Sequence, residues 1–202
     1  SGEAFISLVD DNLNEENFDG VTEFTNNPGV TFTILPETIT NITNTGTDVN
    51  LQANNDLIIR SEQQIITDNP DGDGGSITLQ AGRTIEVDSN ITTDNGNLNI
   101  LANTTADSGT VGEFRDAGIA EIAIADGVTF NTGTGNLVLN IGDSTSASSG
   151  GNITLDSVTA NNVTLATGSG TIDVAGSINA TGNVALTGNE INLLGGENSV
   201  AG

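Results

Sequence analysis

Three aspartates in one glycine-rich stretch are the clearest candidates for metal chemistry in this 202-residue sequence. Asp68, Asp71 and Asp73 fall within Asp68-Asn69-Pro70-Asp71-Gly72-Asp73-Gly74-Gly75. Calcium prefers hard oxygen ligands that are closely spaced on a flexible turn. The spacing therefore predicts a calcium site, although the terminal glutamate and full ligand spacing of an EF-hand loop are missing. An ordinary Asp/Gly-rich turn is the open alternative.

A second candidate is the stretch Glu113-Phe114-Arg115, where an aromatic and a cationic residue meet in an expected loop. Loops carry function when a rigid scaffold positions them, so these residues could contact a ligand. Phe114 could equally anchor the loop on the side of the scaffold. Both interpretations are consistent with the sequence.

Catalytic residue sets are scarce in this chain. Cysteine and histidine are absent, which excludes the usual zinc and haem ligands and the Cys–His and Ser–His pairs. The basic residues are Arg60, Arg83 and Arg115. Glu86 and Asp88 could share one face, but no partner can be placed for the general acid and base work of polysaccharide hydrolysis. The sequence predicts that the protein is not an enzyme.

The charge balance excludes another class of partner. The chain has 27 acidic and 3 basic residues, a formal net charge of −24. Such a charge repels the phosphate backbone, so nucleic-acid binding is not expected. No apolar run is long enough to span a membrane. The hydrophobic fraction of 35% is rich in Val, Ile and Leu, which predicts a folded chain rather than a disordered one.

A five-residue pattern of apolar, any, apolar, any and small residues recurs along the chain. Alternation over so few residues indicates a short strand with one buried face. Stretches rich in Gly, Asn, Ser and Asp separate the copies and suit turns. The copies are Val49–Ala53, Ile77–Ala81, Ile85–Ser89, Leu98–Ala102, Ile153–Ser157, Val163–Thr167, Ile172–Gly176, Val184–Gly188 and Ile191–Gly195.

The spacing of these copies predicts the fold. Ile153, Ile172 and Ile191 are 19 residues apart, and Val163 and Val184 are 21 apart. Each period of about 20 residues therefore holds three short strands that can stack on the next period. The fold class expected is all-β, a right-handed parallel β-helix or solenoid. Recurrent Gly-Asn pairs predict corners with a positive φ at glycine and a ladder of asparagines, as at Gly96-Asn97, Gly135-Asn136, Gly151-Asn152 and Gly182-Asn183.

The pattern is interrupted in three places. Residues 1–29 are acidic and aperiodic, and we expect them to cap one open end of the solenoid. Residues 30–202 form the β-helix. Within it, residues 66–75 lengthen one corner, and residues 103–121 form a long excursion of the kind that is often functional.

Two stretches of the repeat, Gly75–Val87 and Gly170–Val184, resemble those of filamentous-haemagglutinin-like exoproteins. These are β-helical passengers of two-partner secretion in Gram-negative bacteria, and the resemblance covers residues 30–202. It implies a parallel β-helix, export through an outer-membrane transporter, and a role in adhesion or aggregation. Asn26-Asn27-Pro28-Gly29 matches only part of the secretion-domain motif, which favours an internal segment of the shaft.

These observations lead to an expected function. The chain is expected to be a structural and adhesive segment of a large exoprotein, secreted or held at the cell surface outside the outer membrane. Its expected partners are a cell-surface or extracellular-matrix ligand, with glycans among the candidates, and the transporter during secretion. The alternative is a carbohydrate-binding or polysaccharide-active β-helix. Ice binding is disfavoured because Thr31-Phe32-Thr33, Thr38-Ile39-Thr40 and Thr132-Gly133-Thr134 do not recur at the coil period.

Overall fold

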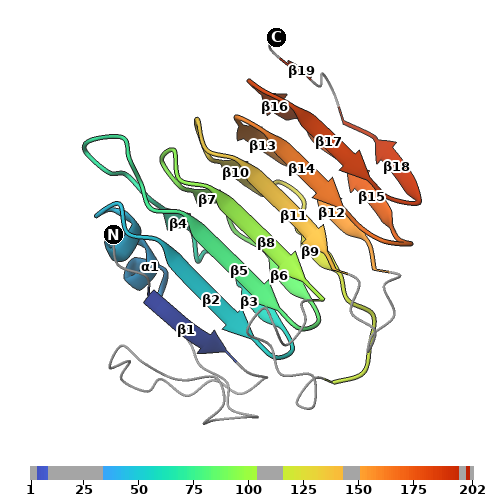
Figure 1. The fold of residues 1–202 in the computed structure, drawn as a ribbon, viewed down its shortest axis with the longest axis horizontal. Coiled ribbons are helices and arrows are strands. Elements are labelled where there is room, and N and C mark those ends of the chain that lie inside the picture. Colours follow the sequence, from blue (N-terminus) through green and yellow to red (C-terminus); the bar gives the residue numbers. More distant parts are fainter. Residues whose placement is uncertain (1–3, 9–33, 104–115, 143–150, 196–198, 201–202) are drawn as a thin grey trace.

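The chain folds as a parallel β-helix, as the repeat spacing predicts (Figure 1). The computed structural model describes residues 4–8, 34–103, 116–142, 151–195 and 199–200. Its strands form three parallel sheets, and each turn of the solenoid contributes one strand to sheet A, then one to sheet B, then one to sheet C. Six such coils follow one another along the axis.

Sheet A has the longest strands and seven members: β1 (Ala4–Leu8), β2 (Val49–Ala53), β5 (Ile77–Ala81), β8 (Leu98–Ala102), β11 (Leu137–Ile141), β14 (Val163–Ala166) and β17 (Val184–Thr187). Sheet B has six: β3 (Leu57–Ile59), β6 (Ile85–Val87), β9 (Ile122–Ile124), β12 (Ile153–Leu155), β15 (Thr171–Val174) and β18 (Glu190–Leu193). Sheet C has six: β4 (Ile65–Ile66), β7 (Ile91–Thr92), β10 (Thr129–Asn131), β13 (Ser157–Ala160), β16 (Ile178–Ala180) and β19 (Ser199–Val200).

Residues that lie one repeat apart in the sequence are register partners in these sheets. Ile153, Ile172 and Ile191 are successive partners in sheet B, and Val163 pairs with Val184 in sheet A. Longer corners stretch some coils without disturbing this register. Val49 and Ile77, for example, are partners although 28 residues separate them, because the corner at 66–75 lies between them.

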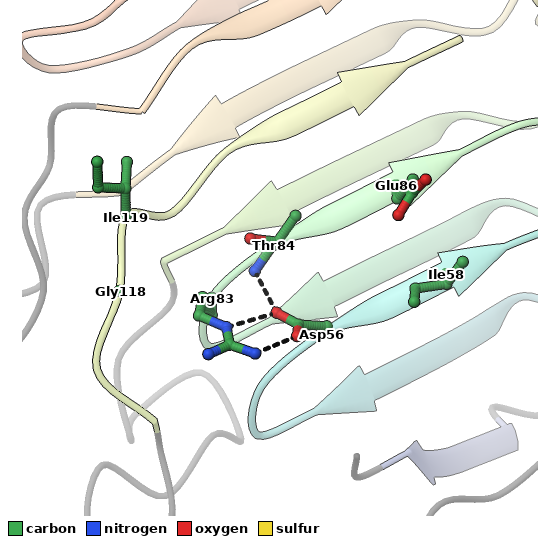
Figure 2. Close-up of a pocket in the computed structure, with 7 residues that line it drawn as sticks. All are labelled: Asp56, Ile58, Arg83, Thr84, Glu86, Gly118 and Ile119. Carbon is green, nitrogen blue, oxygen red and sulfur yellow. Dashed lines mark hydrogen bonds and ion pairs between the residues drawn. The ribbon is translucent and has the colours of Figure 1, made fainter. Parts of the chain in front are cut away.

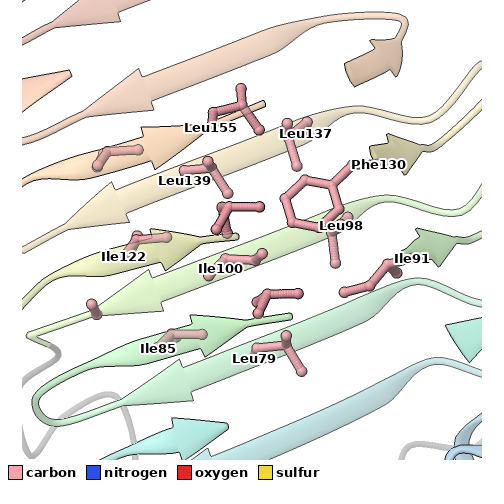
Figure 3. Packing of buried hydrophobic residues seen from close by; sticks show 14 of the residues in the cluster. Leu79, Ile85, Ile91, Leu98, Ile100, Ile122, Phe130, Leu137, Leu139 and Leu155 are labelled. Carbon is pink, nitrogen blue, oxygen red and sulfur yellow. The ribbon is translucent and has the colours of Figure 1, made fainter. Parts of the chain in front are cut away.

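The inward side chains of all three sheets form one core of stacked aliphatic residues (Figure 3). Alternation along the strands of the first five coils places every second residue inside, as the burial of Val49, Leu51 and Ala53 on β2 illustrates. Phe130 is 1% exposed and lies between its register partners Ile91 and Val158. Close packing of this kind makes each buried position sensitive to volume.

The N-terminal end of the solenoid carries two elements that the repeat does not predict. Strand β1 extends sheet A by pairing in parallel with β2. Helix α1 (Pro36–Thr43) begins with proline in its first turn, a favourable position because proline lacks an N–H. Its Ile39 is buried, and the Thr43 hydroxyl lies 2.6 Å from that of Thr67. Residues 9–33, which include most of the expected cap, lie outside the described residues.

The positive φ expected at the Gly-Asn corners is wrong. Within the described part of the chain, glycines with positive φ lie elsewhere, for example at Gly127 and Gly133. The corner glycines are needed because backbones of adjacent coils approach closely. A Cβ atom on Gly135 would lie 2.2 Å from the carbonyl oxygen of Gly96, and one on Gly96 would lie 2.4 Å from that of Gly75. No side chain fits at these contacts.

The predicted ladder at these corners is confirmed and is longer than the asparagines alone. From β2 to β14, the residue just before each sheet A strand accepts, through its side-chain oxygen, the main-chain N–H of the equivalent residue in the next coil. The distances are 2.7–3.2 Å, and the ladder runs through Asp48, Ser76, Asn97, Asn136, Asn162 and Asn183. Similar contacts lie at the starts of strands in the other two sheets. The Thr171 N–H donates to Asn152 Oδ1 in sheet B, and the Ser177 N–H donates to Ser157 Oγ in sheet C.

Candidate functional site

A groove of about 270 Å³ lies on the outside of the first three coils, where sheet A passes into sheet B (Figure 2). Strands β3 and β6 form its floor. Residues 116–121, which lead back to β9 and are called the returning segment below, form one side. Its lining consists of Asp56, Ile58, Arg83, Thr84, Glu86, Gly118 and Ile119. Residues from three successive coils therefore meet in one place.

An ion pair between Arg83 and Asp56 lies in the lining of the groove (Figure 2). Arg83 donates from Nε to Asp56 Oδ1 at 2.8 Å, and its Nη2 pairs with Asp56 Oδ2. Asp56 Oδ1 also accepts the Thr84 N–H at 3.1 Å, because Asp56 and Thr84 both directly precede sheet B strands. The two parallel hydrogen bonds make this a bidentate contact, which orients the guanidinium. Both side chains are about one quarter exposed.

The same arginine holds the returning segment against the coils. Its Nη1 donates to the carbonyl oxygen of Ala117 at 3.4 Å. One residue earlier, the Asp116 N–H donates to Asn55 Oδ1 at 2.6 Å. Gly118 packs so closely that a Cβ there would lie 3.3 Å from Arg83 Cδ. The described end of the excursion, residues 116–121, is thus fastened to the shaft at one corner.

Beyond the ion pair, the groove combines aliphatic walls with a carboxylate. Ile58 is 39% exposed and is the register partner of Glu86, whose side chain points outward from β6. Ile119 is 60% exposed on the opposite side. The groove therefore presents two exposed aliphatic side chains beside one outward-facing carboxylate.

The predicted calcium ligands lie on the lengthened corner next to α1. Amide and carboxylate hydrogen bonds organise this corner: the Asp68 N–H donates to Asn44 Oδ1, and the Asn69 N–H donates to Asp94 Oδ2, both at 2.8 Å. Asp71 and Asp73 are exposed. The described residues contain no group of three or more Asp, Glu, His or Cys side chains placed to hold a metal ion. Calcium binding at Asp68, Asp71 and Asp73 stays a prediction from the sequence.

The other predicted positions are divided between described and undescribed parts. Glu113, Phe114 and Arg115 lie outside the described residues, so their proposed ligand contact stays a prediction. Thr38-Ile39-Thr40 lies within α1 rather than on a strand, and Thr132-Gly133-Thr134 follows β10 at a corner.

Sequence reasoning did not identify the groove. It named Arg83 only as one of the three basic residues and considered Glu86 together with Asp88. Asp56 and Thr84 directly precede the register partners Leu57 and Ile85, and this pairing, which corners of unequal length hide in the sequence, brings Arg83 to Asp56.

Comparison with known proteins gives no relative for this chain. No family model, no curated protein and no solved structure matches it. Among the described residues, no helix has the length and apolar character needed to cross a bilayer.

Proposed function

We propose that this chain is a stiff β-helical shaft segment of a large exoprotein, secreted or attached at a bacterial cell surface, where it supports adhesion. One observation carries the proposal. Each of the three sheets runs through all six coils in the same order, so hydrogen bonds and core packing continue from one end to the other. Stacks of this kind behave as extended, quasi-one-dimensional structures.

The bonding between coils supports a mechanical role. Sheet ladders, the buried aliphatic stack and the side-chain ladder at the corners all join one coil to the next. Loss of one coil would expose the apolar faces of its neighbours. The solenoid should therefore resist local opening better than a chain of small separate domains.

The exported, surface-exposed setting rests on the resemblance of the repeats to filamentous-haemagglutinin-like proteins. The absence of cysteine is compatible with passage through a transporter as an unfolded chain, since no disulfide can form on the way. A high negative charge keeps such a chain soluble after release.

An export experiment tests this proposal. The chain is inserted between a two-partner secretion domain and a terminal epitope tag, in a Gram-negative host with the matching transporter. We expect the tag to reach the surface and the inserted chain to resist protease there. A Gly135→Leu variant, whose side chain cannot fit between coils, should reach the surface but be digested. Retention of the wild-type chain inside, or its digestion outside, would refute the proposal.

The adhesive part of the proposal has a separate assay. Cells that display the chain should bind surfaces coated with glycans or matrix proteins better than cells that display the same exoprotein without it. The carbohydrate-active alternative predicts turnover of a polysaccharide in addition to binding. Release of soluble sugar from the bound polymer would therefore favour that alternative.

A further inference from the structure

The groove between β3, β6 and the returning segment has a chemical character that the shaft function does not use. Its lining holds one arginine, two carboxylates and two aliphatic side chains. The pairing of these charged side chains with one another indicates which kind of ligand the groove can bind.

The positive charge in the groove is neutralised. Arg83 contacts both carboxylate oxygens of Asp56 and also donates to Ala117 O. These contacts engage three of the five guanidinium N–H groups, and the Asp56 carboxylate balances the charge of Arg83. Glu86 is therefore the group that sets the charge of the open part of the groove. An anionic ligand would meet that carboxylate and a chain of net charge −24.

The remaining surface suits an aliphatic stem. Ile58 and Glu86 are neighbours on adjacent strands, and Ile119 lies across from them (Figure 2). Lysine and arginine side chains bury their methylene stems on apolar surface while the charged end stays near water and a carboxylate. Aliphatic side chains beside a carboxylate offer both of these contacts to one side chain.

We propose that this groove binds a lysine or arginine side chain of a partner protein, with the stem between Ile58 and Ile119 and the cation at Glu86. The strongly negative chain attracts basic partners from solution, and the groove gives that attraction a defined position. Binding of a basic side chain at this groove would be independent of the proposed shaft function.

The test uses small probes and the whole chain. Nα-acetyl-lysine amide and Nα-acetyl-arginine amide are titrated into 15N-labelled protein, with Nα-acetyl-norleucine amide as the uncharged control of equal stem length. Saturable shifts of the amide signals of Ile58, Glu86 and Ile119 are expected with the cationic probes. The norleucine probe should bind much more weakly.

Matched variants separate the groove from general attraction. Glu86→Gln should weaken binding about tenfold, the loss expected when a hydrogen bond to a charged group is removed. Glu190→Gln removes an exposed carboxylate from β18 of the same sheet and should leave binding unchanged. Ile119→Ser should weaken binding several-fold, whereas Leu194→Ser, at another exposed aliphatic residue, should not. Circular dichroism checks that each variant is folded.

Four results would overturn the proposal: no saturable binding, equal binding by norleucine, wild-type affinity in Glu86→Gln, or an equal loss in Glu190→Gln. None of these would affect the export assay, so failure here is distinguishable from failure of the shaft function.

Discussion

Asn136 and Asn162 are joined by two hydrogen bonds that cross from one coil to the next. Asn136 Oδ1 accepts the main-chain N–H of Asn162 at 3.2 Å and its Nδ2 at 2.7 Å. Asn136 itself donates from its main-chain N–H and its Nδ2 to Asn97 Oδ1, at 2.9 and 3.1 Å. Asn136 therefore donates to the preceding coil and accepts from the following one. These hydrogen bonds align the starts of neighbouring sheet A strands.

Removal of one member of this ladder should destabilise the fold. Asn136→Ala removes the oxygen that accepts the main-chain N–H and Nδ2 of the half-buried Asn162, whereas the main-chain N–H of residue 136 still donates to Asn97 Oδ1. The expected cost is about 1–3 kcal/mol in the free energy of unfolding. Asn140→Ala, at a half-buried outward position of the same coil, should cost less than about 0.5 kcal/mol. Urea unfolding measures both, and equal effects would mean that the ladder contributes no specific stability.

The corner glycines should differ from turn glycines in their tolerance of alanine. Gly135→Ala would place Cβ 2.2 Å from the Gly96 oxygen, so adjacent coils must separate at that corner. Gly127 has a φ of 81° and no atom within 4 Å of an added Cβ, so Gly127→Ala should cost only about 1–2 kcal/mol. A larger fall in melting temperature is expected for Gly135→Ala. The reverse order would contradict close coil contact as the reason for glycine.

Phe130 should be the most costly core residue to truncate. Its ring is the largest fully buried side chain among the described residues, and neighbouring coils enclose it on both sides. Phe130→Ala should reduce the free energy of unfolding by about 3–5 kcal/mol because a cavity remains. Ile119→Ala, at an exposed aliphatic residue, should change it by less than about 0.5 kcal/mol. A small loss for Phe130→Ala would indicate a core that is not packed as described.

The net charge of −24 predicts that salt stabilises the protein. Screening weakens the repulsion among carboxylates as the Debye length falls from about 30 Å at 0.01 M to about 3 Å at 1 M. The melting temperature should therefore rise with sodium chloride. The rise should shrink at a pH low enough to protonate most carboxylates. A melting temperature that is independent of salt at neutral pH would rule out charge repulsion as a significant destabilising factor.

The fold was predictable because its sequence signal is local and repeated. The pattern Ile77–Ala81 coincides with β5, and the 19-residue spacing of Ile153 and Ile172 coincides with their register. Helix α1 was missed because Thr38-Ile39-Thr40 alternates like a strand, and the β-branched residues favour that interpretation. Contacts at the open end of the solenoid outweigh this local preference, and Pro36 was the one sequence signal for a helix start.

The groove could not be derived from the sequence because it depends on neighbours that are distant along the chain. Asp56 and Arg83 are 27 residues apart, and Asn55 and Asp116 are 61 apart. Corners of unequal length lie between them, so a fixed period of about 20 residues does not align them. Only the observed register brings Glu86 beside Ile58 and places Ile119 opposite.

The distance between spin labels on the outside of sheet A tests the central claim, a continuous stack of coils, most directly. Asn50 and Ala185 belong to one row of register partners that runs through Thr78, Asn99, Val138 and Thr164. The chain contains no cysteine, so two introduced cysteines at Asn50 and Ala185 can be labelled cleanly. Five strand spacings predict a separation of about 24 Å between the two backbones, with a narrow distribution. A broad distribution, or a mean separation far from this value, would contradict the stack.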